Sequence, residues 1–408
     1  MKCRHCHSVL DKAFLDLGFA PPSNAYLTEA DLTKPEVYFP LKLRVCRECW
    51  LVQTEDYARA DELFRDDYAY FSSVSKGWLE HAAKYAAMVT NRFSLSRESM
   101  VIEIASNDGY LLKNFVKAGI PCLGIEPTAS TADAAELLCV PVVREFFGAA
   151  LGRQLRTEGR QADLIAGNNV YAHVPDINDF TQGIKEVLKP EGVITLEFPH
   201  LLNLLEKNQF DTVYHEHFSY LSLYTVCKIF ESCGLRVFDV EQIPTHGGSI
   251  RVYGCHHASQ RVRHASVEQV LLAESESGLQ EYSVFENFQS RADQVKDALL
   301  SFLIEQKRTG KKVVAYGAAA KGNTLLNYGG VKPDLLSVIA DAATSKQGKF
   351  MPGSHIPIVS PEVLTDLKPD YVVVLPWNIA AEVMESQHAL RRTGAQFVTA
   401  VPQLKIVP

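Results

Sequence analysis

The densest group of ionisable side chains in the sequence is the run Tyr214-His215-Glu216-His217. Two histidines beside a glutamate could bind a metal, but helical zinc motifs place their histidines four residues apart, and here they are two apart. Histidine takes up a proton near neutral pH, and a neighbouring carboxylate or phenol can orient it. The run therefore indicates general acid–base chemistry, with a polar surface loop as the alternative interpretation.

Further polar side chains follow a predicted strand at residues 162–166. Asn168 and His173 lie directly after this strand. The carboxyl ends of parallel strands carry the sites of doubly wound α/β folds, so both residues are candidates for binding or catalysis. Tyr68 and Tyr70 precede a predicted amphipathic helix that could cover the same edge, although packing is the commoner role for tyrosines in an aromatic cluster.

Four cysteines form two pairs, Cys3-x-x-Cys6 and Cys46-x-x-Cys49, with 39 residues between the pairs. Two such pairs supply the four thiolates of a tetrahedral structural zinc site. His5 and His7 are less well placed as ligands, and reduced free thiols are the other interpretation. The spacer is longer than in compact zinc ribbons, so we expect it to contain an excursion around residues 21–24.

Residues 100–112, MVIEIASNDGYLL, predict a buried strand, a tight turn and the start of a helix. Small residues in such a turn let a ligand approach the backbone closely. A second predicted strand ends in Glu126, 23 residues after Glu103, where a carboxylate can accept hydrogen bonds from a ribose diol. The candidate cofactor-binding residues are Glu103, Ala105, Asn107, Gly109, Glu126 and Asn168.

The turn lacks the GxGxxG pattern that cradles a dinucleotide pyrophosphate. It resembles instead the E/D-x-G/A-x-x-x-G turn of class I S-adenosylmethionine methyltransferases, whose ligand is a nucleoside without phosphate. An ordinary strand-to-helix turn is the alternative for these seven residues alone. Residues 235–241 and 249–254 predict an antiparallel strand pair that ends the same sheet.

A second strand, Gly/Ala turn and helix begin at Lys311, with the sequence KKVVAYGAAAKGNTLL. Predicted strands at residues 335–341 and 371–376 follow it. The turn contains Lys321 and a helix N-terminus, which together favour phosphate oxygens. A pyrophosphate-linked sugar fits this turn better than NAD(P) does, because AYGAAAKGN does not match GxGxxG.

Composition limits the possible functions. The chain has 408 residues, 47% of them hydrophobic and 22% charged, with a net charge of −7, which predicts two or three domains without the basic footprint of a nucleic-acid-binding protein. No run of about 18 apolar residues predicts a membrane span, and the N-terminus enters a cysteine motif instead of a signal peptide. We expect a cytoplasmic monomer or small homo-oligomer that binds neither nucleic acid nor membrane.

The order of these parts resembles the nucleotide-sugar C-methyltransferases, which make branched deoxysugars, over essentially the whole chain. The two cysteine pairs, the VIEIASNDGYLL turn, the YHEHFSYLS segment and VVAYGAAAKGNTLLN carry the resemblance. It implies an α/β fold class with three parts. These are an N-terminal zinc-binding head (1–57), a central class I methyltransferase Rossmann-like sheet (58–258) and a C-terminal second Rossmann-like domain (259–408) that contributes to nucleotide-sugar binding.

The resemblance also implies the ligands. S-adenosylmethionine and a structural Zn²⁺ are the expected cofactors, and the expected substrate is a dTDP-linked 4-keto-deoxyhexose that is methylated at C3. The implied zinc ligands are Cys3, Cys6, Cys46 and Cys49. The residues implied at the reacting sugar are Tyr214, Glu216 and His217, with His173 and one of Tyr68 and Tyr70 nearby.

The expected chemistry starts from the weak nucleophilicity of carbon, which improves when a proton beside a carbonyl is removed. His217 would remove the C3 proton, and Tyr214 or His173 would stabilise the enolate oxygen. Glu216 would orient the sugar or the imidazole. Two other classes of function stay open at this stage: a nucleotide-dependent sugar oxidoreductase or epimerase, and a non-catalytic zinc-headed binding protein.

Overall fold

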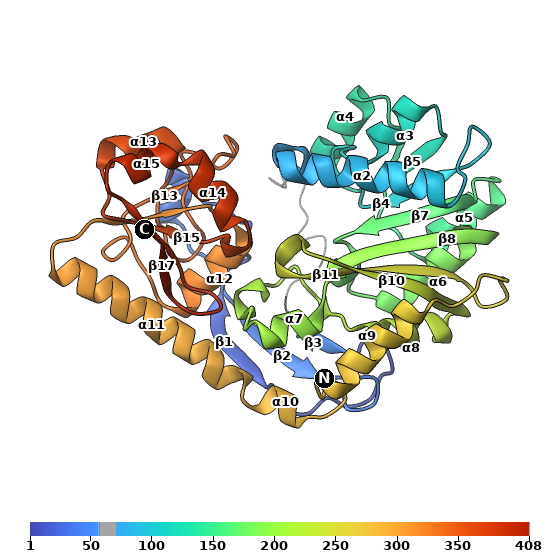
Figure 1. The fold of residues 1–408 in the computed structure, drawn as a ribbon, viewed down its shortest axis with the longest axis horizontal. Helices are drawn as coiled ribbons and strands as arrows, with labels where there is room; N and C mark the ends of the chain where they lie inside the picture. Colours follow the sequence, from blue (N-terminus) through green and yellow to red (C-terminus); the bar gives the residue numbers. More distant parts are fainter. Residues whose placement is uncertain (56, 58–70, 408) are drawn as a thin grey trace.

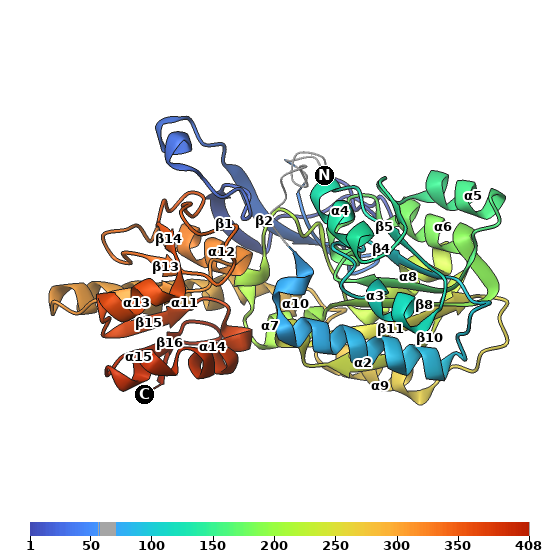
Figure 2. The ribbon, with the colours of Figure 1, turned by 90° about the horizontal axis from the view of Figure 1, so that it is seen from above.

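The computed structural model describes residues 1–55, 57 and 71–407, and these residues form three β-sheets. A seven-stranded and a six-stranded sheet form two large units, and a four-stranded sheet near the N-terminus lies between them (Figure 1). Viewed from above, the ribbon of β1 and β2 runs along the junction of the two large units (Figure 2). The predicted α/β fold with an N-terminal cysteine head is therefore confirmed.

The seven-stranded sheet is parallel except for β11, which is antiparallel to both of its neighbours. An antiparallel pair at the end of this sheet is what the sequence predicted. In spatial order the strands are β10 (Leu235–Ile243), β11 (Ser249–His256), β8 (Leu188–Pro199), β7 (Ala162–Asn168), β4 (Val101–Ile104), β5 (Cys122–Ile125) and β6 (Val142–Val143).

Helices cover both faces of this sheet, because successive side chains of its central strands point to opposite sides. Val101 packs into the core beneath one set of helices, and Ile102 packs into the core on the other side. The first set is α2 (Lys76–Arg92), α3 (Leu112–Ala118) and α4 (Ala129–Leu137). The second set is α5 (Ala149–Thr157), α6 (Ile177–Val187), α8 (Leu223–Ser232) and α9 (Ala265–Glu276).

The four-stranded sheet joins the N-terminal head to the central unit. It contains β1 (Leu15–Ala20), β2 (Phe39–Val45) and β3 (Val52–Thr54), and its fourth strand is β9 (Ser219–Tyr220), which directly follows the YHEH run. Strands β3 and β9 are antiparallel, with Val52 opposite Tyr220. The head is thus hydrogen-bonded to the segment that carries the candidate acid–base residues.

The six-stranded sheet forms the C-terminal unit. Its spatial order is β14 (Ile358–Val359), β13 (Ile339–Ala340), β12 (Val313–Tyr316), β15 (Tyr371–Val374), β16 (Gln396–Thr399) and β17 (Lys405–Val407). The predicted strand at 335–341 is shortened to two residues, because the amides of Leu335 and Leu336 bond back to the carbonyl of Lys332 in a turn. Its helices are α12 (Ala320–Tyr328), α13 (Pro361–Leu367), α14 (Ala380–Ser386) and α15 (His388–Arg392).

One hydrophobic core joins the three parts. It contains Val45 of the head, Phe210 of the central unit and Leu326 of the C-terminal unit, together with residues of the long connecting helix α11 (Phe288–Arg308). Burial of this kind stabilises a fixed arrangement of the units. The remaining elements are α7 (Leu201–Glu206), α10 (Ser283–Glu286), η1 (Glu29–Thr33), η2 (Ser72–Val74), η3 (Tyr171–His173), η4 (Phe210–Thr212), η5 (Thr245–Gly247) and η6 (Trp377–Ile379).

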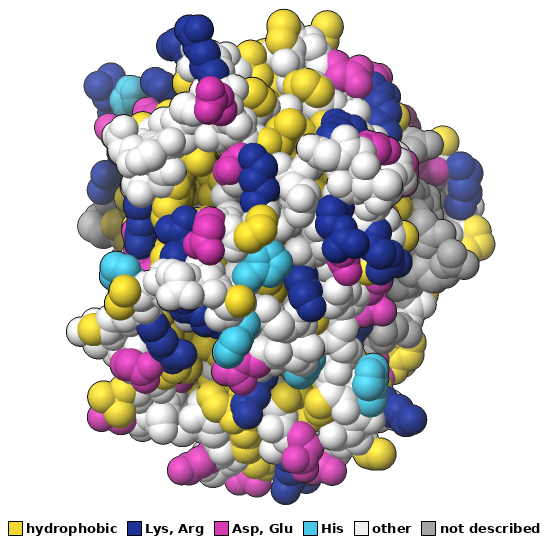
Figure 3. Space-filling view, turned by 90° about the vertical axis from the view of Figure 1, so that its right-hand side faces the viewer, with side chains coloured by type: hydrophobic (Ala, Val, Ile, Leu, Met, Phe, Trp, Pro, Cys, Tyr) yellow, Lys and Arg dark blue, Asp and Glu magenta, His cyan; other side chains and the backbone are white. Residues whose placement is uncertain are grey.

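The surface carries both signs of charge. On the face shown in Figure 3, Lys and Arg side chains are interspersed with Asp and Glu and do not gather in one basic patch. Within the described ranges, no helix is long and apolar enough to cross a membrane.

Candidate active site

The four cysteines of the head converge on one point. Their sulfur atoms all lie within 4.8 Å of one another, with 3.5 Å between Cys3 and Cys49 and 3.4 Å between Cys6 and Cys46. Four thiolates at such separations suit a tetrahedral zinc ion with Zn–S bonds of about 2.3 Å. The Gln53 amide, on β3, donates a hydrogen bond to the Cys3 sulfur, and this bond orients one of the four candidate ligands.

Neither His5 nor His7 belongs to this group of possible metal ligands. His5 bonds through Nδ1 to the side chain of Asn178, which lies on α6. Among the described residues, the only group of three or more His, Cys, Asp or Glu side chains arranged to hold a metal is the four cysteines. The four-cysteine interpretation is therefore favoured over a mixed ligand set.

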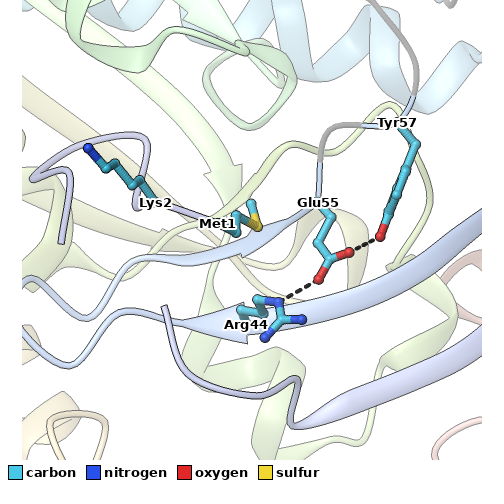
Figure 4. Close-up of a pocket in the computed structure, with 5 residues that line it drawn as sticks. All are labelled: Met1, Lys2, Arg44, Glu55 and Tyr57. Atoms are coloured by element: carbon cyan, nitrogen blue, oxygen red, sulfur yellow. Dashed lines mark hydrogen bonds and ion pairs between the residues drawn. The ribbon is translucent and has the colours of Figure 1, made fainter. Parts of the chain in front are cut away.

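A shallow depression lies on the surface of the head, lined by Met1, Lys2, Arg44, Glu55 and Tyr57 (Figure 4). In it, Glu55 accepts hydrogen bonds from Arg44 and Tyr57. It contains none of the residues that the sequence singled out for chemistry. The candidate cofactor-binding residues lie elsewhere, at the carboxyl ends of the strands of the seven-stranded sheet.

The turn after β4 has the backbone shape expected of a close ligand approach. Ala105, Asn107 and Gly109 have φ values of 57°, 49° and 75°, so every second residue is left-handed. This conformation is unfavourable for a residue with a Cβ atom, and its repetition here marks a turn that the surrounding fold holds in place. The carboxyl of Glu103, just before the turn, is fully buried, and burial raises its pKa well above the usual value.

Glu126 lies at the tip of β5, where the sequence placed it. Its two carboxylate oxygens accept hydrogen bonds from the backbone amides of Asn107, at 3.0 Å, and Thr128, at 2.9 Å. These bonds fix the carboxylate beside the left-handed turn. Each oxygen keeps a further lone pair, which a ribose hydroxyl could use.

Asn168 ends β7 at the same edge of the sheet. Its side chain is buried, and neither its amide nitrogen nor its oxygen has a hydrogen-bond partner in the described part of the chain. A buried amide without partners costs free energy unless a ligand or water satisfies it. Together with the turn and Glu126, Asn168 thus fits a bound nucleoside such as that of S-adenosylmethionine.

The acid–base residues form a hydrogen-bonded relay. His217 bonds through Nδ1 to the carbonyl oxygen of Thr212 at 3.0 Å, and through Nε2 to the Tyr214 hydroxyl at 2.7 Å. A carbonyl can only accept, so Nδ1 carries the proton and donates it to Thr212, and Nε2 accepts from Tyr214. His217 is thus held as a neutral imidazole whose basic nitrogen is Nε2.

Burial keeps the neighbouring histidines neutral as well. The rings of His173 and His217 are 4.5 Å apart at an interplanar angle of 74°. Burial lowers the pKa of His173 to about 4, and burial together with the charge of a protonated His173 lowers the pKa of His217 well below 6.5. His215 lies apart from this group, with its Nε2 directed at the backbone oxygens of Phe39 and Pro40.

The third residue of the group, Glu216, is bonded by a residue that sequence reasoning gave no role. The side-chain nitrogen of Asn24 lies 2.8 Å from each Glu216 oxygen. Asn24 comes from the excursion of the zinc head, 192 residues away in sequence. Nothing in the local sequence marks it, because only the tertiary fold brings the two segments together.

The C-terminal unit contributes a cation to the same region. The Lys321 ammonium donates a hydrogen bond to the neutral amide of Asn378 at 2.7 Å and lies 5.0 Å from the centre of the Trp377 ring. Trp377 in turn donates to Asp211 of the central unit at 2.7 Å. Burial lowers the pKa of Lys321, and the Lys321 charge contributes to the lowered pKa of His217.

The Gly/Ala turn of the C-terminal unit is used for internal contacts. The Ala318 amide donates to Asp341 at 2.7 Å, and the Ala318 carbonyl accepts from Tyr26 at 2.6 Å and from Lys346 at 2.9 Å. In a dinucleotide-binding turn, the backbone groups contact the pyrophosphate. Here side chains of the protein already occupy backbone groups of the turn, which disfavours the NAD(P) alternative. Two candidate residues, Tyr68 and Tyr70, lie outside the described residues.

The strand order, the left-handed turn and the acid at the tip of β5 define a class I S-adenosylmethionine-dependent methyltransferase fold. Three family models match successive parts of the chain: a zinc-binding domain over residues 3–64, a methyltransferase domain over 78–240, and a C-methyltransferase C-terminal domain over 244–402. The C-methyltransferase NovU of Streptomyces niveus is 34% identical over 406 residues, which is 100% of this chain and 96% of that protein. The chain therefore belongs to the C-methyltransferases.

Other similarities are partial. An uncharacterized methyltransferase of Mycobacterium leprae is 28% identical over 99 residues, 24% of this chain and 36% of that protein. The solved structure of magnesium protoporphyrin IX methyltransferase from Synechocystis aligns with a TM-score of 0.34 and 13% identity over 44% of this chain and 80% of that one. The glycopeptide N-methyltransferase MtfA aligns with a TM-score of 0.34 and 12% identity over 43% and 96%.

The full-length relative and the family models confirm three of the sequence predictions: an S-adenosylmethionine-dependent C-methyltransferase, its methyl donor and its zinc-binding head. The non-catalytic binding protein is excluded as an alternative. The individual roles of His217, Tyr214, Glu216 and His173, and of the cofactor-binding residues, stay predictions.

Proposed function

We propose that this C-methyltransferase acts on a nucleotide-linked 4-keto-deoxyhexose, most simply a dTDP sugar, at the carbon next to the ketone, C3. The observation that carries the proposal is the relay from Thr212 through His217 to Tyr214, because methylation of carbon beside a ketone requires a base. The relay keeps His217 neutral and its Nε2 available at neutral pH.

In the proposed reaction, substrate binding moves the Tyr214 hydroxyl from Nε2 of His217 to the ketone oxygen at C4. His217 then takes the C3 proton at Nε2, and the electron pair of the broken C–H bond moves into the enolate. The Tyr214 hydroxyl and His173 stabilise the negative oxygen by hydrogen bonding. S-adenosylmethionine, when bound, would supply the methyl group that the C3 carbon takes up as the ketone is restored, and S-adenosylhomocysteine would leave with the electron pair of the broken sulfur–methyl bond.

The charges of the C-terminal unit support an anionic substrate. Lys321 comes within electrostatic reach of His217; its hydrogen-bond partner Asn378 is neutral, and the acid whose charge acts on it is the buried Asp211. A diphosphate is attached to C1 of the sugar, two carbons from the proposed reacting carbon. We propose that Lys321 faces this diphosphate while His217 faces C3.

The test is a direct assay of methyl transfer. Purified protein is incubated with S-adenosylmethionine and a dTDP-linked 4-keto-deoxyhexose, and the sugar nucleotide is analysed by mass spectrometry and NMR. We expect replacement of one C3 hydrogen by a methyl group. Methylation at oxygen, or no product with any 4-keto sugar nucleotide while other carbon acids are methylated, would contradict the proposal.

A further inference from the structure

The excursion of the zinc head bridges the C-terminal unit and the candidate active site. It leaves β1 after Ala20, and the Tyr26 hydroxyl donates to the Ala318 carbonyl of the C-terminal unit at 2.6 Å. Leu27 and Phe350 then exchange two backbone hydrogen bonds of 3.0 and 2.8 Å. Two anchors in successive residues fix the path of the chain just after Asn24.

The fixed backbone places the Asn24 side chain beside Glu216. Its Nδ2 atom lies 2.8 Å from both Glu216 oxygens, and the Glu216 side chain is buried. An ionised carboxylate only accepts hydrogen bonds, and a neutral amide that donates to it favours the charged form without cancelling the charge. A donor shared between both oxygens also restricts rotation of the carboxylate plane.

We propose that Asn24 is a positioning residue for C-methyl transfer: it holds the Glu216 carboxylate oriented so that Glu216 accepts hydrogen bonds from the sugar. This inference rests on the proposed function, because it takes Glu216 to face the substrate. It extends the active site to the zinc head, which sequence reasoning assigned only to metal binding. The head, the central unit and the C-terminal unit then all contribute to the geometry of one carboxylate.

The first test compares two variants of Asn24 with a matched control at Thr28. Asn24→Ala removes the donor, Asn24→Asp replaces it by a second carboxylate, and Thr28→Ala alters the same loop at a side chain whose hydrogen-bond partner among the described residues is Asp31. We expect kcat/KM for the sugar nucleotide to fall about 10-fold or more in Asn24→Ala and further in Asn24→Asp, since like charges repel. Thr28→Ala should match the wild type, and S-adenosylmethionine affinity and zinc content should stay unchanged in all three.

The second test is a double-mutant cycle with Glu216→Gln. If Asn24 acts through Glu216, Asn24→Ala should lower kcat/KM far less in the Glu216→Gln variant than in the wild type. Equal fold losses in both backgrounds, or an Asn24→Asp variant as active as Asn24→Ala, would overturn the positioning role while leaving methyl transfer intact. A folded wild-type chain that methylates no keto sugar would instead refute the proposed function, and the positioning role with it. If Asn24→Ala does not fold, Asn24→Ser, which retains a donor, replaces it. Asn24→Ser should lower kcat/KM less than Asn24→Ala, and this decrease must also be smaller in the Glu216→Gln background than in the wild type.

Discussion

At the scale of single residues, the protonation state of His217 follows from its surroundings. The Thr212 carbonyl fixes the proton on Nδ1, and burial prevents a second proton from binding at neutral pH. A histidine with an ordinary pKa would be partly protonated at pH 6.5 and unable to act as a base in that fraction. The lowered pKa makes His217 a weaker base, but it also keeps Nε2 unprotonated in nearly all molecules near neutral pH.

The role of His217 can be tested by His217→Asn, which keeps a polar side chain but cannot take a proton at neutral pH. Turnover should fall by about 10²–10⁴, the usual contribution of acid–base catalysis, with little change in substrate binding. With S-adenosylhomocysteine in place of the methyl donor, the wild type should exchange the C3 hydrogen for solvent deuterium, and the variant should not.

A companion variant separates the base from its hydrogen-bond partner. Tyr214→Phe removes the hydroxyl that is proposed to stabilise the enolate and leaves the imidazole in place, so deuterium exchange should slow in parallel with turnover without being abolished. Wild-type exchange in His217→Asn would transfer the role of base to another group, with His173 the nearest described candidate at 4.5 Å between rings.

Glu126 offers a second prediction at this scale. Glu126→Ala should weaken S-adenosylmethionine binding by about 1.5–3 kcal/mol, the range for a lost hydrogen bond to a charged group, because both the ribose contact and the support of the Asn107 amide disappear. Glu136→Ala is the matched control, since this exposed acid of α4 pairs with Arg144. Calorimetric titration measures both, and an unchanged affinity in Glu126→Ala would mean that this acid does not bind the ribose.

At the scale of elements, the short strand β3 links the metal centre to the relay. It begins three residues after Cys49, and its partner β9 begins two residues after His217. Thr54, the last residue of β3, bonds through its hydroxyl to the His217 carbonyl at 3.1 Å and through its amide to the Phe218 carbonyl at 3.2 Å. The backbone that presents His217 is thus hydrogen-bonded to the strand that follows the second cysteine pair.

Loss of zinc should therefore reduce the rate of methyl transfer much more than it reduces the affinity for S-adenosylmethionine. Cys46→Ser should reduce zinc content and turnover together, while the seven-stranded sheet keeps S-adenosylmethionine affinity, because none of the cofactor-binding candidates lies in the head. Cys139→Ser, at an exposed cysteine outside the cluster, is the control. Full turnover in metal-free protein would show that the head is independent of the relay.

The sequence predicted the elements of the central sheet better than the contacts between units. The strand at Val101–Ile104 and the acid at Glu126 are marked by local patterns of burial and spacing, and both lie where they were expected. Tyr214 and His217 are three residues apart, so their contact is also local. The bonds of Asn24 to Glu216 and the approach of Lys321 to His217 depend on how distant segments pack, which no local pattern encodes.

At the scale of the whole molecule, the candidate site lies where three units share a core. The head supplies Asn24, the central unit supplies His217, and the C-terminal unit supplies Lys321. Because Val45, Phe210 and Leu326 belong to one hydrophobic cluster, separation of the units would expose apolar surface. The site is thus assembled by the same packing that stabilises the fold, and its titrating groups should influence stability.

The buried histidines predict that the protein loses stability on acidification. The pKa values of His173 and His246 are lowered to about 4 by burial, so between about pH 6.5 and pH 4 the unfolded chain binds protons at these sites and the native protein does not. Together they should lower the free energy of unfolding by about 2.7 kcal/mol per pH unit in that window, and His217 acts in the same direction. Burial raises the pKa of Asp211 to about 6 and that of Glu103 well above its usual value, and each acid opposes the histidines by up to about 1.4 kcal/mol per pH unit where only the native protein holds its proton.

Urea unfolding at about pH 7.5, 6 and 5 measures the net effect. We expect the free energy of unfolding to fall between about pH 6.5 and 5, less steeply than the histidines alone would give, because Asp211 and Glu103 act in the opposite direction. His246→Asn should reduce the pH dependence of the free energy of unfolding by the equivalent of about one proton relative to the wild type, because asparagine does not titrate. A pH dependence that His246→Asn leaves unchanged would show that this histidine titrates alike in the native and the unfolded protein, which would contradict the neutral state inferred for the buried histidines.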